Sequence, residues 1–295
     1  MRVVVAGASG LVGRALVTRL RDRGDEVVRL VRRPAREPDE LAWDPETGFL
    51  PELALRGADA VVNLGGAPLG ARRWTRDYKV AIRDSRVQGT ALLARTLSAL
   101  EDGPRVLVQA SAVGWYGDRG EDPLEEGSGR GDGFLADVVA AWEAAATPAV
   151  AAGVRVALAR TGIVLSREGG ALARLLPLVR RGLGGPLGPG TQFWPWITLE
   201  DEVTALLHLL DVEVSGPVNL VAPQQSRCVE VVRSLARAVH RPSALRVPSW
   251  ALRLALGEFA EDLLASQRVV PAALAGSGFR WRHAGLQEAA RAVTA

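Results

Sequence analysis

The feature that most constrains this chain is an apolar run that leads directly into three evenly spaced glycines. Val3 to Ala6 are continuously apolar and mostly β-branched, which predicts a strand covered by helices on both faces. Gly7, Gly10 and Gly13 follow at intervals of three, and an amphipathic pattern runs over Leu11–Arg23. A strand, a glycine turn and a helix in this order present free N–H groups to a diphosphate. The sequence therefore predicts a dinucleotide site whose contacts are Gly7, Ser9, Gly10, Leu11, Val12 and Gly13.

Length and composition fit an ordinary globular protein. The 295 residues allow one large or two modest domains, and an apolar share of 48% supports a substantial core. No apolar run approaches the roughly 18 residues of a membrane span, and the stretch after Arg2 is too short for a signal peptide. Cys228 is the single cysteine and the three histidines are scattered. We therefore expect a cytoplasmic protein with no disulfide, no metal site and no membrane partner.

The net charge of +3 and the pI near 9.7 do not by themselves indicate a nucleic-acid partner. The basic residues are almost all arginine, are dispersed among acids and form no run longer than two. Aromatic residues are not interleaved with them as they are in single-strand binders. We expect a small-molecule substrate and no nucleic acid, and we leave self-association open.

Strand and helix patterns alternate through the first half of the chain. Such alternation predicts an α/β fold with a doubly wound parallel sheet of the Rossmann type. The two longest helical patterns cover Ser85–Leu100 and Asp132–Ala152. The expected strands are Val3–Ala6, Glu26–Val31, Ala58–Leu64, Arg105–Ser111 and Val154–Arg160.

The composition changes after Leu165, where glycine and proline become frequent and helical patterns resume only near Glu200. We expect a Rossmann domain over residues 1–165, with a contribution from 196–221, and a smaller, mainly helical substrate lobe over 166–295. Trp194 and Trp196 lie in the glycine-rich region and either line a substrate pocket or anchor the loop. Asp201, which follows them, is interpreted as a structural residue at a helix start.

The residues after the second expected strand select between the two pyridine nucleotides. In this fold an acid at that point binds the 2′-hydroxyl of NAD, whereas an arginine accommodates the 2′-phosphate of NADP. The chain has Arg32 and Arg33 there, and its acids Asp25 and Glu26 lie at the entering end of the strand. A guanidinium binds phosphate by charge and by two parallel hydrogen bonds. The sequence therefore predicts NADP(H) as the cofactor, with Arg32 the stronger contact.

The glycine turn Gly7–Gly13, the strand end Asn63–Gly66 and the segment Ser111–Gly117 together resemble the extended or atypical short-chain dehydrogenase/reductase superfamily. Within it the chain is similar to the sugar-nucleotide-epimerase-like proteins called epimerase family proteins, whose C-terminal segment is a domain of unknown function. The resemblance implies a Rossmann core with NADP(H), and it adds Leu64, Gly65 and Arg86 to the cofactor contacts. It covers the whole chain in order and rests on Gly7–Gly13, Asn63–Gly66, Arg72–Thr75, Ser85–Arg86, Ser111–Gly117, Trp142–Glu143, Arg160–Leu165, Gly169–Leu172, Gly182–Gly185, Gln192–Ile197, Gly216–Asn219 and Gly276–Phe279.

The superfamily's usual acid-base pair is missing from this chain. Its members normally act through a tyrosine whose pKa is lowered by a lysine four residues later, with a glutamate a further four residues on. Placing Glu143 at the glutamate position puts Val139 at the lysine and Leu135 at the tyrosine. No tyrosine or lysine occurs between Gly117 and Ala295, so no shift of register restores the pair.

Ser111 and Tyr116 remain as candidate catalytic residues near the expected nicotinamide. Ala112 competes with Ser111 for the position of the superfamily's serine, and Tyr116 is also explained as a packing residue. Asp137 is a weaker candidate, because helix acids usually face solvent. Two functions stay open: oxidoreduction or epimerisation of a small carbonyl or sugar-like substrate, and a non-catalytic NADP(H)-binding regulatory or sensor module.

Overall fold

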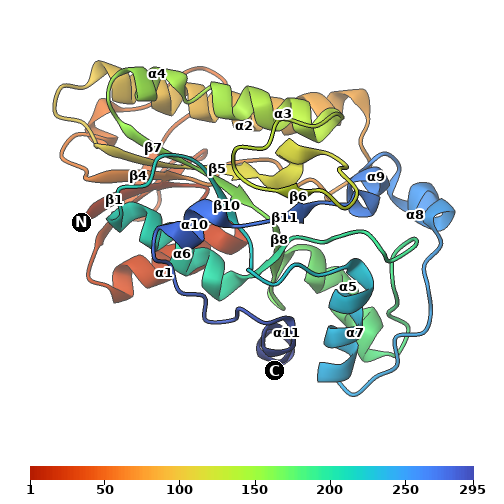
Figure 1. Cartoon of the computed structure of the whole chain (residues 1–295). Helices are drawn as coiled ribbons and strands as arrows, with labels where there is room; N and C mark the ends of the chain where they lie inside the picture. Colours follow the sequence, from red (N-terminus) through yellow and green to blue (C-terminus); the bar gives the residue numbers. More distant parts are fainter.

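The computed structural model describes residues 1–295, apart from the side chain of Ala171. Its centre is a seven-stranded sheet in which every neighbouring pair is parallel (Figure 1). The chain crosses over at β1, which lies between β4 and β2, as in a doubly wound fold. In spatial order the strands are β10 (Gly216–Leu220), β7 (Arg155–Thr161), β5 (Val106–Ala112), β4 (Ala60–Asn63), β1 (Arg2–Ala6), β2 (Glu26–Val31) and β3 (Glu40–Ala42).

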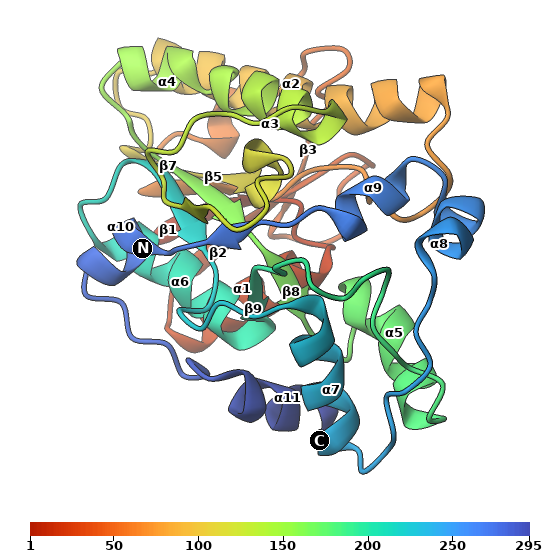
Figure 2. The same ribbon diagram turned by 45° about the vertical axis from the view of Figure 1, so that its right-hand side comes forward.

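Helices cover both faces of this sheet, which confirms the predicted fold class (Figures 1 and 2). One face is covered by α1 (Leu11–Asp22), α6 (Leu199–Asp211) and α10 (Ala272–Gly276). The other is covered by α2 (Arg76–Ala99), α3 (Phe134–Ala144) and α4 (Thr147–Ala151). Alternate residues of each strand enter the two cores, because successive side chains of a strand point to opposite faces.

The helices depart from the sequence prediction at two places with local causes. The α2 helix begins at Arg76, nine residues before the predicted start, because the Thr75 hydroxyl accepts a hydrogen bond from the N–H of Tyr78 and caps it. The single helix predicted over 132–152 is two helices, since Pro148 sits in the first turn of α4, where its ring is tolerated only at a helix start. The strand β2 has the predicted bounds.

The window Phe134–Ala151 is long and apolar enough by composition to cross a membrane, and one third of it is buried. The same residues form α3 and α4, which pack against α2 and the sheet. This segment is therefore a covering layer of the fold.

The C-terminal part of the chain forms a second core beside the sheet. It contains α5 (Gly170–Arg180), α7 (Cys228–Ala238) and α11 (Leu286–Thr294). Trp194 and Trp196 are buried in it and their indole N–H groups donate to the Leu263 carbonyl and the Ser226 hydroxyl. The two tryptophans therefore anchor the glycine-rich loop.

Several contacts join this lobe to the sheet. Lys79 on α2 forms an ion pair of 2.6 Å with Glu258, and Trp74 packs on Phe259 with ring centroids 5.4 Å apart. The carboxylate of Asp201 is buried and accepts the backbone N–H groups of Arg282 and His283, as expected of a structural residue. The remaining elements are β6 (Pro123–Leu124) paired with β11 (Arg268–Val269), β8 (Ile163–Leu165) paired with β9 (Trp196–Thr198), α8 (Ser249–Leu256), α9 (Phe259–Leu264) and the short helices Glu52–Ala54 and Val113–Tyr116.

Candidate functional site

The glycine turn after β1 is held by close backbone contacts that only glycine permits. Gly7 has φ of +79°, and a Cβ there would lie 2.6 Å from the carbonyl carbon of Leu64. A Cβ on Gly13 would lie 2.2 Å from the carbonyl oxygen of Gly7. Gly7 therefore brings β1 against the end of β4, and Gly13 brings α1 against the turn.

Gly10 has a different role from its two neighbours. Its φ of −73° is open to any residue, and the nearest atom to a Cβ there is the Gly7 carbonyl oxygen at 3.4 Å. It is the N-cap of α1, no side chain caps this helix, and the first turn holds no acid. The helix start is thus exposed and its N–H groups have no intrahelical acceptors, which suits a bound diphosphate.

The other predicted residues of the turn lie around this helix start. Ser9 is exposed, and its carbonyl accepts a hydrogen bond from Arg14. Leu11 is half-buried against Gly169, and Val12 packs on the core. The structure therefore gathers all six predicted loop residues at one edge of the sheet.

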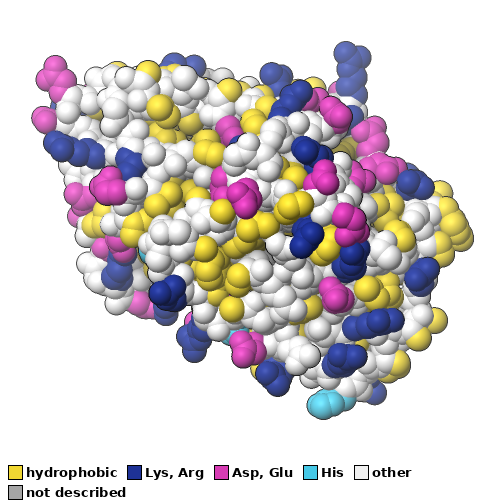
Figure 3. Space-filling view, viewed as in Figure 1, with side chains coloured by type: hydrophobic (Ala, Val, Ile, Leu, Met, Phe, Trp, Pro, Cys, Tyr) yellow, Lys and Arg dark blue, Asp and Glu magenta, His cyan; other side chains and the backbone are white. Residues whose placement is uncertain are grey.

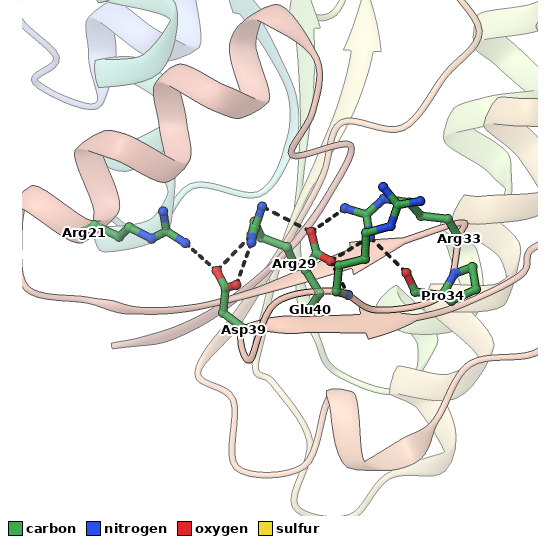
Figure 4. A network of polar contacts seen from close by, with 7 residues as sticks. Arg21, Arg29, Arg33, Pro34, Asp39 and Glu40 are labelled. Atoms are coloured by element: carbon green, nitrogen blue, oxygen red, sulfur yellow. Dashed lines mark hydrogen bonds and ion pairs between the residues drawn. The ribbon is translucent and has the colours of Figure 1, made fainter.

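Arg32 and Arg33 follow β2 but their side chains differ in what they contact. Arg33 donates to both oxygens of Glu40 at 2.7 Å and also to the carbonyl of Pro34 (Figure 4). Arg32 is exposed, and it forms no ion pair or hydrogen bond with any residue that the structure describes. Of the two predicted phosphate contacts, Arg32 therefore has the free guanidinium.

The Arg33–Glu40 pair belongs to a charged network that stiffens this end of the sheet. Arg29 forms a two-pronged pair with Asp39, which Arg21 also contacts (Figure 4). The hydrogen bond from Arg33 lowers the pKa of the buried Glu40 carboxyl to about 2, and that from Arg29 lowers the pKa of Asp39. Both acids stay ionised and hold these arginines at neutral pH.

Leu64, Gly65 and Arg86 lie where β4 ends, next to the glycine turn. The N–H of Leu64 donates to the carbonyl of Ala6, and that of Gly65 to the side chain of Asn63. The Arg86 guanidinium lies over the Trp142 ring and against Gly66. Burial lowers its pKa to about 10, and it has no acidic partner among the described residues. This half-buried guanidinium donates to the carbonyl of Ile82 and has no acid to balance its charge, which suits an anionic or strongly polar ligand.

Leu135 and Val139, which the resemblance places at the tyrosine and lysine positions of the usual acid-base pair, both lie on α3. Leu135 and Val139 both lie against Gly114, 3.3 and 3.8 Å from a Cβ built there. Asp137 faces solvent and forms an ion pair with Arg130 at 2.8 Å, so it does not enter the site.

The Ser111 hydroxyl belongs to a buried network between β5, β7 and α3. Ser111 is 4% exposed and donates to the Glu143 carboxylate at 2.6 Å. Arg160 donates to both oxygens of Glu143, at 2.8 and 2.9 Å. Burial opposes the charge of Arg160, yet its bonds to Glu143 raise its pKa above the ordinary value. Ala112, the competing position, faces the opposite side of the sheet, since strand side chains alternate.

Tyr116 continues the same network toward β10. Its phenol is fully buried, accepts a hydrogen bond from Arg160 at 3.1 Å and donates to the Asn219 side-chain oxygen at 2.7 Å. Burial raises the pKa of this phenol. The Asn219 amide in turn donates to the carbonyl of Val270. Tyr116 therefore links the sheet to the C-terminal lobe, and its role as an acid or base stays a prediction.

Sequence reasoning assigned no role to Arg160, although one signal was available, and it left Asn219 open as a turn residue or a pocket hydrogen-bond donor. Arg160 follows the apolar residues Val156–Ala159 of an expected strand, and a buried arginine requires a buried acid. The sequence does not show which acid pairs with Arg160, because Glu143 is 17 residues away. Asn219 belongs to the same network through its hydrogen bond with Tyr116, from which it is 103 residues away.

A cavity of about 540 Å³ lies apart from these residues, between α1, the start of α6 and α11. Arg19, Arg167 and His283 line it, and it includes none of the predicted site residues.

Comparison with known proteins agrees with this geometry over the whole chain. Residues 3–221 match the NAD dependent epimerase/dehydratase family, and residues 247–293 match a domain of unknown function, DUF1731. The epimerase family protein Mb2239 of Mycobacterium bovis is 45% identical over 289 residues, which cover 97% of this chain and 95% of that protein.

Solved structures resemble the fold just as extensively. The crystal structure of the human epimerase family protein SDR39U1 (isoform 2) with NADPH has a TM-score of 0.91 and 33% identity, covering 99% of both chains. The nucleoside-diphosphate sugar epimerase of Corynebacterium glutamicum has a TM-score of 0.80 and 36% identity, covering 98% of this chain and 57% of that one.

Proposed function

Because this chain belongs to the NAD dependent epimerase/dehydratase family, we propose that it binds NADP(H) across the edge formed by β1, β2 and β4. The glycine turn and the start of α1 would hold the diphosphate, and Arg32 the 2′-phosphate. Leu64, Gly65 and Arg86 would border the cofactor beyond the diphosphate. The human relative was crystallised with NADPH, which supports the same choice.

One observation carries this proposal, namely the unequal pairing of the two adjacent arginines. Glu40 engages both terminal nitrogens of Arg33, which leaves Arg32 as the cation that can bind an added phosphate without breaking an ion pair. NADPH and NADH differ by that phosphate alone, so the pairing predicts the preference.

We further propose that the protein is an epimerase-like oxidoreductase acting in the cytoplasm on a small carbonyl or sugar-like compound. Bound NADPH supplies a hydride, and the chain must orient the substrate and handle a proton. The Ser111 hydroxyl donates to Glu143, so its lone pairs would accept a proton when an alcohol is oxidised, whereas carbonyl reduction by NADPH would need a proton from another group such as Tyr116 or from water. Tyr116 is oriented by Arg160 and Asn219 in the same way.

A second function, a non-catalytic NADP(H)-binding module, is favoured by a specific observation. Both candidate hydroxyls are buried and hydrogen-bonded, and Leu135 and Val139 are hydrocarbon. In such a module the cofactor would regulate a partner through the C-terminal lobe.

Calorimetric titration of Arg32→Ala and Arg33→Ala tests the cofactor assignment. We expect wild type to bind NADPH more tightly than NADH, and Arg32→Ala to weaken NADPH binding by roughly tenfold to a hundredfold while leaving NADH unchanged. Arg33→Ala is the matched control and should retain most of the preference. Equal affinity of the wild type for both nucleotides would refute the assignment.

Stereospecifically deuterated NADPH separates the enzyme from the module. The purified protein is incubated with a panel of carbonyl and sugar-nucleotide compounds, and label transfer is followed by mass spectrometry. Transfer to any compound establishes oxidoreduction. Tight NADPH binding without transfer across the panel favours the module.

A further inference from the structure

Two stretches of the C-terminal lobe contain no acidic residue. The full chain holds 36 Lys and Arg against 33 Asp and Glu, so it is close to neutral. Residues 169–199 and 231–257 nevertheless have no Asp or Glu at all. The rest of the chain holds 28 basic residues and all 33 acidic ones. The eight basic residues of these stretches are Arg174, Arg180, Arg181, Arg233, Arg237, Arg241, Arg246 and Arg253, all of them exposed.

The fold brings the two stretches side by side. Val247 accepts a hydrogen bond from the N–H of Gly188 at 2.8 Å and donates its own N–H to the carbonyl of Pro186 at 3.0 Å. The Arg241 guanidinium donates to the carbonyl of Arg180. In Figure 3 the surface at the lower right, which α5 and α7 occupy in Figure 1, displays basic and hydrophobic side chains. The arginines of the two acid-free stretches therefore lie in one part of the C-terminal lobe.

Large apolar side chains project from the same region. Trp250 and Leu254 are one turn apart on α8 and are 68% and 70% exposed. Leu245 and Leu183, on the two paired segments, are each at least half exposed. Figures 1 and 2 show α8 at the outer margin of the lobe, away from the sheet. Arg181, Leu183, Leu245 and Arg246 lie along the two paired segments that lead to α8. We call this strip, together with Trp250 and Leu254, the α8 tip.

We propose that the α8 tip docks on an anionic phospholipid surface. Tryptophan and leucine enter the interfacial layer of a bilayer, and arginines beside them bind lipid phosphates. A deformable bilayer accepts a projecting helix without a matching groove. Composition alone predicts no membrane partner, because the arginines of this surface come from separate stretches that only the fold brings together.

The charge of the tip argues against a second copy of this chain as the occupant. A twofold interface built from this surface would gather the arginines of both copies with no acid among the tip residues to pair with them, and like charges repel. Arg253 is not counted in the tip, because it forms an ion pair with Glu261 at 2.8 Å. A protein partner would need an acidic rim around an apolar groove, and the experiment distinguishes this case.

Cosedimentation with phosphatidylcholine vesicles, with and without phosphatidylglycerol, tests the proposal. We expect binding only to the anionic vesicles, and weaker binding as salt is raised. Trp250→Ser with Leu254→Ser should reduce binding by roughly tenfold or more. Arg181→Gln with Arg246→Gln should reduce it by roughly fivefold for each arginine.

Leu53→Ser with Phe49→Ser is the matched control. Leu53 is 69% exposed, as much as Leu254, but lies in the short helix Glu52–Ala54, outside the lobe. This control should bind like the wild type, and thermal unfolding should show that all variants are folded. Equal loss in the control, or no binding to anionic vesicles, would overturn the proposal; in the second case an acidic protein is the better occupant. Concentration-dependent dimers that the α8 variant abolishes would also overturn it, in favour of self-association.

Discussion

The two ends of the same sheet edge differ in whether their polar groups are free. At the cofactor end, formed by β1, β2 and β4, the start of α1 has no capping side chain and Arg32 has no partner among the described residues. At the α3 end, formed by β5 and β7, Ser111 and Tyr116 are both bonded to neighbours in the fold. Unsatisfied groups at a surface indicate a ligand, whereas satisfied buried groups indicate a scaffold.

This difference separates what the family match implies from what the side chains support. The cofactor end has a glycine turn, an uncapped start of α1 and the free guanidinium of Arg32, which are the parts that the proposed dinucleotide would use. At the α3 end, an ion pair and its hydrogen-bonded neighbours lie beside α3, whose tyrosine and lysine positions hold Leu135 and Val139. Variants at the two ends should therefore affect different measurements, binding in one case and stability in the other.

The largest effect is expected from breaking the ion pair at the α3 end. Arg160→Met leaves the Glu143 carboxylate buried without its partner, which should lower the free energy of unfolding by about 3–5 kcal/mol. Arg130→Met breaks the exposed Arg130–Asp137 pair and is the control, with an expected loss below about 1 kcal/mol. Urea denaturation measures both. Similar small losses would show that the α3 end is not the scaffold we describe.

The cofactor end should instead show an effect on binding alone. Gly10→Ala has room in the protein, so it should fold normally, but its methyl group would occupy the approach of the diphosphate. We expect NADPH binding to weaken by about two orders of magnitude, or about 2.8 kcal/mol. Gly13→Ala, by contrast, collides with the Gly7 carbonyl and should destabilise the fold itself. Calorimetry beside thermal unfolding distinguishes the two; normal binding by Gly10→Ala would place the diphosphate elsewhere.

Glu202 extends the comparison to the other face of β7. Its carboxyl is fully buried, accepts a hydrogen bond from Thr161 at 2.8 Å, and has one oxygen without a partner. Burial raises its pKa to about 8. The folded protein thus keeps a proton that the unfolded chain releases above pH of about 4.3, so stability falls as the pH rises from there toward 8.

Glu202→Gln should remove this dependence, which amounts to at most about 1.4 kcal/mol for each pH unit. The measurement is the urea midpoint of wild type and variant at several pH values between about 5 and 8. Glu200→Gln, in the same helical turn but half-exposed and paired with Arg282, is the control and should keep the wild-type slope. If the urea midpoints of wild type and Glu202→Gln changed equally with pH, the Glu202 carboxyl would be ionised in the folded protein.

The sequence predicted the strand, turn and helix of the cofactor end, for a local reason, and its cofactor contacts stay a prediction. Its determinants are a strand, a turn and a helix within Arg2–Asp22, and the pattern of glycines shows directly where backbone approaches backbone. Even there the different contacts of Arg32 and Arg33 were not predicted. They depend on Glu40, which reaches Arg33 only because β3 pairs with β2. The β3 strand has three residues, too few to show the alternation of apolar and polar side chains that predicts a strand.

For the α3 end, the sequence predicted only that the tyrosine and lysine of the usual pair are missing. Its contacts were not predicted, because they join residues that are distant in sequence. The missing tyrosine and lysine are visible as Leu135 and Val139, but the pairing of Ser111 with Glu143 depends on how α3 packs on β5. Helix α5 was also missed, since glycines flank it and Pro177 lies inside it. Burial partners across a fold are set by tertiary packing, which no local pattern records.

The smallest expected effect on stability, and the sharpest test of the comparison, is at Ser111. Ser111→Ala removes one hydrogen bond but leaves Glu143 bonded twice to Arg160, so the loss should be about 1 kcal/mol or less. Ala112→Ser places a hydroxyl on the opposite face of β5 and is its counterpart. Both variants are measured by urea denaturation and, with any compound that accepts label from deuterated NADPH, by the rate of transfer. If Ser111→Ala abolishes transfer while remaining folded, the hydroxyl reaches substrate and the α3 end is an active site after all. If transfer persists, Ser111 is part of the scaffold, and the proton must come from Tyr116, from the substrate or from water.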